Sequence, residues 1–138
     1  TGLPRVYREA PLNSIWEGSG NVNALDLLRA LGKEPASLNA WLAEVGAVRG
    51  NDARFDAAVT GVLDQLARDP FQLEAQARLL AERMALLLQG SILTQNAPNE
   101  VADAFVATRL GPGGAPRTFG AYDTQIDVDA LIDRASPH

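Results

Sequence analysis

The residues with chemical character are concentrated in one short stretch, Asn-Ser-Ile-Trp-Glu-Gly-Ser-Gly-Asn, which we predict to be a loop over residues 13–21. The stretch carries a single carboxylate, Glu17, between Trp16 and Gly18. An apolar aromatic neighbour excludes water from a carboxylate, and partial desolvation gives it the higher proton affinity that a general base needs. A glutamate in a loop is more often simply solvated. The residue pattern by itself therefore leaves both interpretations open for Glu17.

The second half of the same stretch, residues 18–21, could bind an anion. Glycines leave the backbone N–H groups unhindered, and the helix that we expect to follow carries partial positive charge at its N-terminus. Ser19 and Asn21 are also good helix caps, so the alternative is simple capping. The glycine spacing matches neither a P-loop nor the dinucleotide-binding fingerprint.

Metal chemistry finds little support in the sequence. Four aspartates near the C-terminus resemble a calcium loop, but the turn glycine and the terminal glutamate of an EF-hand are missing. We interpret them as an acidic tail with a helix cap. Cysteine is absent, and the single histidine is the last residue, His138, so thiolate or histidine sites are disfavoured. The aspartates are Asp123, Asp127, Asp129 and Asp133.

Length and composition indicate one globular domain of a water-soluble protein. The chain has 138 residues, 46% of them hydrophobic, with no apolar run near the ~18–20 residues of a membrane span. No signal-peptide pattern precedes Arg5, so we expect a cytoplasmic protein with no membrane partner. A net charge of −5 argues against an extended surface for nucleic-acid phosphates. The first residues look like the interior of a longer chain, and we expect a fragment.

Helical periodicity runs through almost the whole sequence and predicts an all-α, antiparallel helical bundle of about five helices. A short helix over 3–11 presents Leu3, Val6 and Tyr7 on one face. The first long helix should begin between Ser19 and Asn23 and end at Gly32. The second should span 35–49, with Gly50 after it, and the third should be capped by Asn51 or Asp52.

The fourth predicted helix is the most apolar and should lie at the centre of the bundle. It starts at Asp69-Pro70-Phe71-Gln72, which has the residues of a capping box, and runs to about Asn96. Met84 within it, and Trp41 before it, are assigned to the core. A fifth helix from Pro98 to Gly111 should turn Val101, Ala104, Phe105 and Thr108 inward, and a short last helix should cover 128–135.

Two segments together resemble the C-terminal catalytic-loop region of the acyl-CoA dehydrogenases. They are Arg-Val-Tyr-Arg-Glu-Ala at 5–10 and Ile-Trp-Glu-Gly-Ser-Gly-Asn at 15–21. Most of the family carries aromatic-Glu-Gly-Thr here, whereas Trp-Glu-Gly-Ser-Gly-Asn followed by Leu-Asp-Leu-Leu-Arg at 25–29 is similar to the AidB-like branch. The motif covers about residues 3–31. The helices to about 110 fit the family only loosely, and the tail beyond 111 is not matched.

The resemblance implies an FAD enzyme of fatty-acid metabolism that removes an α-proton and a β-hydride from an acyl-CoA. Glu17 falls on the catalytic base, and its backbone N–H would help to hold the thioester carbonyl. Trp16 would pack beside the substrate and flavin, so Trp16 and Glu17 are the substrate-binding residues. Gly18, Ser19 and Asn21 would lie against FAD, with Ser19 in place of the usual threonine. Some relatives place the catalytic base elsewhere in the fold, which leaves the role of Glu17 as the base open.

The resemblance also sets expectations for organisation and partners. Residues 1–21 would be the catalytic-loop segment, 22–110 the C-terminal bundle, and 111–138 a loop with a terminal helix. The N-terminal and middle domains that supply most flavin and acyl contacts are not in this sequence, so the chain alone should be inactive and should need the rest of its parent chain. A homo-oligomer, tetramer or dimer, is expected. The alternative is a nucleic-acid or protein interaction module of an AidB-like alkylation-response protein.

Overall fold

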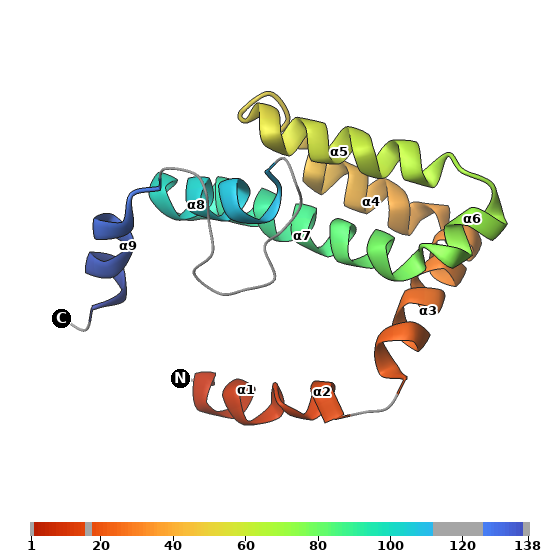
Figure 1. The fold of residues 1–138 in the computed structure, drawn as a ribbon, viewed down its shortest axis with the longest axis horizontal. Helices are drawn as coiled ribbons and strands as arrows, with labels where there is room; N and C mark the ends of the chain where they lie inside the picture. The colour runs from red at the N-terminus through yellow and green to blue at the C-terminus, as the bar shows by residue number, and fades with distance from the viewer. Residues whose placement is uncertain (1, 16–17, 112–125, 137–138) are drawn as a thin grey trace.

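The computed structural model describes residues 2–15, 18–111 and 126–136, and every regular element in these ranges is an α-helix. The prediction of an all-α protein is therefore confirmed for this part of the chain. Four of the helices are short, and the five longer ones form the bundle (Figure 1). In chain order the helices are α1 (Leu3–Glu9), α2 (Leu12–Ile15), α3 (Ser19–Lys33), α4 (Pro35–Gly46), α5 (Ala53–Leu66), α6 (Pro70–Ala75), α7 (Ala77–Asn96), α8 (Asn99–Arg109) and α9 (Val128–Ala135).

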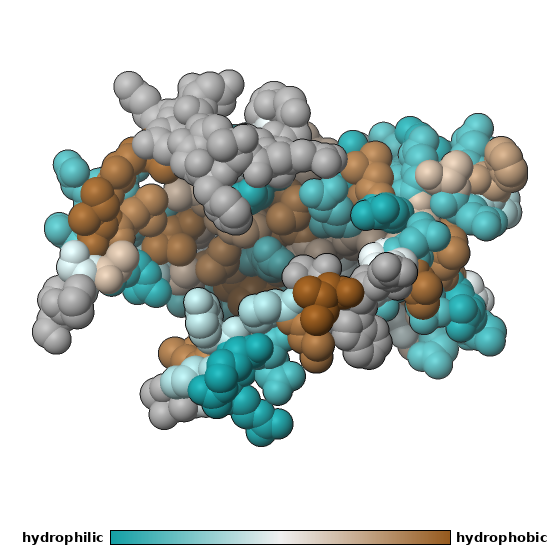
Figure 2. Space-filling view, turned by 60° about the horizontal axis from the view of Figure 1, so that its bottom comes forward, coloured by the Kyte–Doolittle hydropathy of each residue, from teal (hydrophilic) through white to brown (hydrophobic). Residues whose placement is uncertain are grey.

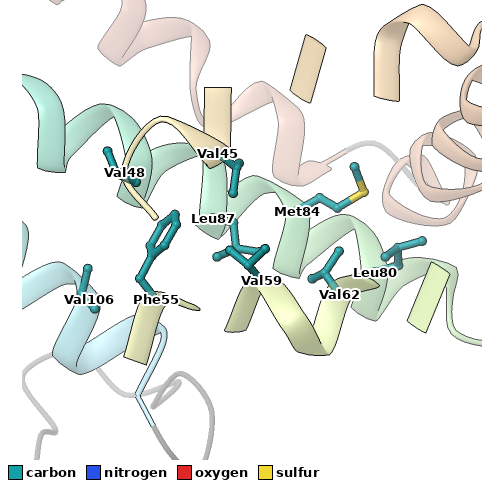
Figure 3. Packing of buried hydrophobic residues seen from close by; sticks show 9 residues of the cluster. All are labelled: Val45, Val48, Phe55, Val59, Val62, Leu80, Met84, Leu87 and Val106. Atoms are coloured by element: carbon teal, nitrogen blue, oxygen red, sulfur yellow. The ribbon is translucent and has the colours of Figure 1, made fainter. Parts of the chain in front are cut away.

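Helix α7 is the centre of the bundle, as the apolar residues around much of its circumference predict. It contacts α3, α4, α5 and α8, and α5 runs alongside it in the opposite direction (Figure 1). Side chains from α4, α5, α7 and α8 meet in one buried cluster (Figure 3). Met84 is in this cluster and Trp41 packs against it, so both core assignments are confirmed. The buried members are Val45, Val48, Phe55, Val59, Val62, Leu80, Met84, Leu87 and Val106.

A glycine in α7 lets three elements approach one another closely. A methyl group on Gly90 would lie 3.1 Å from the ring of Phe55 and 3.2 Å from Leu110, which is tighter than normal packing. Phe55 belongs to α5, and Leu110 is the C-cap residue of α8. The small residue therefore sets the distance at which α5 and the end of α8 pack on α7.

Polar contacts also join α4 to α7 beside the apolar cluster. The indole Nε1 of Trp41 donates to the backbone oxygen of Met84 at 3.2 Å. The hydroxyl of Ser91, which is fully buried, donates to the backbone oxygen of Glu44 at 2.8 Å. Each buried polar atom thus has a partner, and the two helices are held in one register along their length.

A charged cluster joins the start of α5 to α8. Asp52 caps α5 by accepting from the backbone N–H groups of Arg54 and Phe55, which confirms the predicted cap. The guanidinium of Arg54 reaches both Asp52 and Asp103, at 2.6 Å each. The hydrogen bond from the Arg54 side chain lowers the pKa of Asp52, against the opposing effect of burial. Hydrogen bonds to Asp52 and then to Asp103 raise the pKa of Arg54.

The predicted fourth helix is interrupted, which corrects the sequence-based interpretation. Asp69 caps its start as expected, with Pro70 in the first turn, but the helix breaks at Gln76 into α6 and α7. The Gln76 side chain accepts from Gln65 at 3.3 Å and from Arg68 at 2.7 Å. Gln65 is fully buried and also accepts from Arg83 on α7. The break thus coincides with side-chain bonds to α5 and its C-terminal end, which helical periodicity does not encode.

Two predicted helix ends are also wrong. Helix α3 does not stop at Gly32 but continues to Lys33, because the residue before Pro35 is the one forced out of helical geometry. Glu34 accordingly has φ −128° and ψ 78°. Helix α4 ends at Gly46, three residues before the predicted 49, and a turn intervenes before Gly50 at φ +88°. Pro35 does occupy the first turn of α4, as predicted.

The inward face of α8 is the third correction. The residues expected inward are only half-buried, whereas Ala102 and Val106 are buried. The half-buried residues are Val101, Ala104, Phe105 and Thr108. Helix α8 packs against both α7 and α5, and the positions of these two helices decide which of its residues are buried. The predicted end of this helix near Gly111 and the helix over 128–135 are confirmed.

The short helices α1 and α2 lie apart from the bundle, and α9 contacts it at α8 (Figure 1). Hydrophobic side chains reach the surface on the α1–α2 side and on the α9 side of the face in Figure 2. None of the helices in the described ranges is long and apolar enough to cross a membrane. The bundle therefore supplies the packed scaffold, and the segment with chemical character connects it to α1 and α2.

Candidate functional site

The predicted loop over residues 13–21 is shorter than expected. Residues 12–15 form the single turn α2, and α3 already begins at Ser19. Trp16 and Glu17, the two residues assigned to catalysis and substrate binding, lie outside the described residues. Within the described part the stretch that connects α2 to α3 is therefore represented by Gly18, which is also the N-cap of α3.

Gly18 has a backbone geometry that favours glycine. Its φ is +70°, in the left-handed region that costs an ordinary residue about 1–2 kcal/mol. Its carbonyl accepts from the backbone N–H groups of Asn21 and Val22, both at 3.0 Å. The chain thus changes direction at Gly18 and enters α3 at once.

The start of α3 lacks the side-chain cap that the sequence predicts. No side-chain hydrogen bond caps this helix at its N-cap residue, Gly18, and Ser19 is already its first helical residue. Ser19 is half-buried, whereas Gly20 and Asn21 are exposed. The structure therefore brings Gly18, Ser19 and Asn21 together in the first turn of one long helix. Its backbone donors point away from the helix body, as at any helix N-terminus.

Arg78, from the start of α7, lies beside this helix end, and sequence reasoning did not single it out. A methyl group on Gly20 would lie 3.7 Å from Arg78 Nη2. The same arginine lines an open groove of about 910 Å³ together with Ala75, Gln76, Leu79 and Glu82. Sequence reasoning missed it because Arg78 and Gly20 are separated by 58 positions, and only the packing of α3 on α7 brings them together.

This arrangement suits an anionic ligand. Backbone N–H groups at a helix start and a guanidinium are the two groups that proteins most often use for phosphates and carboxylates. Among the described residues no group of three or more His, Asp or Glu side chains could hold a metal ion. The described half of the site can therefore bind and orient a ligand.

Comparisons with known proteins point to one family. The chain is 36% identical over 130 residues to the Escherichia coli (strain K12) protein named "Putative acyl-CoA dehydrogenase AidB". It is 30% identical over 115 residues to the Caenorhabditis elegans protein named acyl-CoA dehydrogenase family member 11. These matches cover 94% and 70% of this chain, but only 23% and 19% of the two relatives. No family model and no solved structure matches the chain.

The match to the E. coli protein includes the candidate site. Any span of 130 residues within a chain of 138 contains residues 9–130, and so contains the whole stretch from Trp16 to Asn21. The chain corresponds to less than a quarter of each relative's length. The similarity therefore applies to the site segment and the bundle together.

Proposed function

Because this chain is homologous to the acyl-CoA dehydrogenase family, we propose that it is the C-terminal helical part of an FAD-dependent enzyme of that family. The reaction would be the α,β-dehydrogenation of an acyl-CoA thioester. The observation that carries the proposal is the Trp-Glu-Gly-Ser-Gly-Asn segment, which lies within the matched span and leads into the first turn of α3. Residues 1–21 would be its catalytic-loop segment, 22–110 its bundle and 111–138 its tail.

Glu17 is the proposed catalytic base. Its carboxylate would take the α-proton of the acyl chain, and its backbone N–H would donate to the thioester carbonyl as negative charge develops on that oxygen. Trp16, the preceding aromatic residue, would cover the reacting carbons and exclude water from them. The left-handed geometry of Gly18 supports these roles, since it fixes where the chain leaves Glu17 and enters α3.

The residues at the start of α3 fit a flavin cofactor. FAD would supply the acceptor for the β-hydride. Gly18, Ser19 and Asn21 would line it, with backbone donors at the helix start and the hydroxyl of Ser19 as hydrogen-bonding groups. Arg78 adds positive charge beside Gly20, which suits the phosphates of such a cofactor. The open space next to Gly18, where an added methyl group would meet nothing within 4 Å, would let the cofactor approach the backbone closely.

The chain alone should have no dehydrogenase activity, because the relatives supply more than three quarters of their length outside the matched region. The test therefore uses the longer polypeptide in which we expect this sequence to occur. Its absorbance spectrum reports bound flavin. Anaerobic addition of an acyl-CoA panel should bleach the flavin in the wild-type protein, and the Glu17→Gln variant should keep its flavin spectrum but show no bleaching.

A matched control separates the base from the fold of the loop. Ser19→Ala should weaken flavin retention while leaving substrate-dependent bleaching of the flavin that remains. If flavin bleaches equally in wild type and Glu17→Gln, the base is another residue. A protein that purifies with FAD but is bleached by no acyl-CoA contradicts the dehydrogenase proposal. Acyl-CoA oxidation by the isolated 138-residue chain would contradict the claim that it needs further domains.

The interaction-module alternative predicts a different result. A DNA-binding version of this chain should shift duplex DNA in a salt-dependent manner near physiological salt. The net charge of −5 and the single lysine, Lys33, favour the enzyme proposal over this alternative. A salt-dependent shift of DNA by the purified chain would reverse that preference.

A further inference from the structure

Two glutamine side chains join the break between α6 and α7 to α5 through a series of hydrogen bonds. Gln65 is fully buried, and its amide Nε2 donates to Gln76 Oε1 at 3.3 Å. Arg68, just beyond the end of α5, donates to the same oxygen at 2.7 Å. The oxygen of Gln65 accepts from Arg83 Nη1 on α7 at 3.1 Å. Both the break and the second turn of α7 are therefore bonded to the end of α5.

The two arginines leave each amide a single orientation. A guanidinium has N–H donors and no acceptor, so the amide atom that faces it must be the oxygen. Gln76 therefore turns its oxygen to Arg68, and Gln65 turns its oxygen to Arg83 and its NH₂ to Gln76. Among the described residues, every buried side-chain nitrogen and oxygen has a hydrogen-bond partner. A buried polar network that is fully satisfied holds one geometry and resists small shifts.

This geometry sets the position of Arg78. Gln76 has φ −111° and ψ 13°, and Arg78 is the second residue of the helix that starts directly after it. Helix α6 and the start of α7 lie beside α3 at one end of the bundle, where Arg78 approaches Gly20 (Figure 1). The Arg78 side chain is exposed, and none of the ion pairs between described residues includes it. Its location therefore depends on the backbone that carries it.

We propose that Gln65 and Gln76 are positioning residues, which place the guanidinium of Arg78 where it binds the phosphates of the cofactor. This inference rests on the proposed function and adds to it the side chains that locate its anion-binding group. A charge-assisted hydrogen bond requires the donor and the phosphate oxygen to lie within a narrow range of distances. Gln65 is fully buried and cannot touch a ligand, so any effect that it has on binding must pass through its neighbours.

The first test measures the position of Arg78 in the purified 138-residue chain by NMR. A nuclear Overhauser contact between the Gly20 α-protons and the Arg78 side chain is expected in the wild-type chain. Gln76→Leu keeps the size of the side chain but removes the accepting oxygen, and this contact should be lost. A contact that is unchanged in Gln76→Leu would overturn the inference.

The matched control is Gln95→Leu at the other end of α7. Gln95 Nε2 donates to Glu44 Oε1 at 2.7 Å and to Ser91 Oγ at 3.0 Å, so it also joins α7 to a neighbouring helix. It lies about 25 Å from Arg78 along the helix axis. Gln95→Leu should therefore leave the contact between Arg78 and Gly20 intact.

A double variant separates positioning from loss of the fold. Gln76→Leu alone leaves the buried NH₂ of Gln65 without a partner, which destabilises the chain. Gln65→Leu combined with Gln76→Leu removes both amides and leaves apolar groups of similar size, a change that costs far less stability. The double variant should remain folded and should still lose the contact between Arg78 and Gly20.

The second test measures FAD affinity in the longer polypeptide, from the change in flavin fluorescence as the apoprotein is titrated with FAD. Arg78→Ala and the double glutamine variant should each raise the dissociation constant of FAD by about threefold to tenfold. In the Arg78→Ala background the glutamine substitutions should have no further effect, because their effect passes through Arg78. Gln95→Leu should bind FAD as the wild-type protein does. Once saturated with FAD, all variants should be bleached by acyl-CoA at the wild-type rate.

The outcomes distinguish this inference from the proposed function. A wild-type protein that binds no FAD contradicts the proposed function and this inference with it. FAD affinity that is unchanged in the double glutamine variant contradicts this inference alone. Losses of affinity that add fully in the Arg78→Ala background would show that the glutamines do not act through Arg78. Equal loss in Gln95→Leu would mean that general destabilisation, and not the position of Arg78, weakens binding.

Discussion

The bundle and the outlying helices use the same kind of sequence with opposite results. Phe55, Leu80 and Leu87 in the bundle are at most 1% exposed, whereas Leu3, Val6 and Tyr7 on α1 are at least 63% exposed. Both sets repeat at helical spacing. The difference is that α3, α4, α5 and α8 each pack against α7, whereas the contacts of α1 are mainly with the short helix α2. A helical spacing of apolar residues therefore specifies a helix and its apolar face. It does not specify whether the same chain provides a surface that covers this face.

The helix starts also differ in how they are capped. Helices α5 and α6 begin with an aspartate whose carboxylate accepts from two backbone N–H groups. Helix α3 begins at Gly18 with no side-chain cap. Helices α4, α7 and α8 also begin without a side-chain cap, so an uncapped start is not specific to the helix at the proposed cofactor site.

The largest effect on stability is expected from a substitution in the packed core of the bundle. Phe55→Ala should lower the free energy of unfolding by about 3–5 kcal/mol, because the ring is 1% exposed and packs against α7 beside Gly90. Tyr7→Ala, at an 80% exposed aromatic residue, should change it by less than about 0.5 kcal/mol. Urea denaturation of both variants measures the difference. Equal losses would mean that α1 is packed in solution as tightly as α5.

A smaller effect is expected where the outlying segment joins the bundle. Gly18→Ala should destabilise the chain by about 1–2 kcal/mol, because φ +70° strains any residue with a Cβ. Gly20→Ala is the control, since its methyl group would meet only Arg78 at an ordinary contact distance and alanine favours the helix. Thermal unfolding of the pair decides between them. If Gly20→Ala lowers the stability more than Gly18→Ala does, then the space available for a side chain, and not the backbone geometry, determines which residues this turn accepts.

The smallest expected effect concerns the capped and paired start of α5. Asp52→Asn keeps a capping oxygen but loses the charge that pairs with Arg54, and should cost about 1 kcal/mol at neutral pH. The pKa of Asp52 is lowered in the folded chain, so the unfolded chain takes up this proton first as the pH falls. The stabilisation is thus complete above about pH 3.9 and is lost as the pH drops through the folded value.

Urea unfolding of wild type and Asp52→Asn over a series of acidic pH values measures this effect. The difference in the free energy of unfolding between the two proteins should disappear as the pH falls below the ordinary range of aspartate pKa values. Asp26→Asn removes the partner of Arg29 in an exposed pair and is the control, with an expected change below about 0.5 kcal/mol. A difference in the free energy of unfolding that persists at the lowest pH would show that Asp52 acts through its shape and not through its charge.

The positions of most helices along the sequence could be predicted from local chemistry. Asp52 and Asp69 identify their helix starts because a short acceptor before a helix satisfies free N–H groups, and Pro35 suits a first turn. The centrality of α7 follows from its apolar girth. The break at Gln76 could not be predicted, since it depends on bonds to Gln65 and Arg68 from another part of the chain. The buried face of α8 likewise depends on where α5 and α7 lie.

The candidate site divides in the same way. The sequence by itself determined that Trp16, Glu17, Gly18, Ser19 and Asn21 lie together, because adjacent residues on one short segment cannot be far apart. Only the tertiary structure decided that Arg78 lies beside Gly20 and that α1 and α9 keep their apolar faces exposed. Contacts between distant residues depend on how helices pack, and packing is set by the whole core and not by any local pattern.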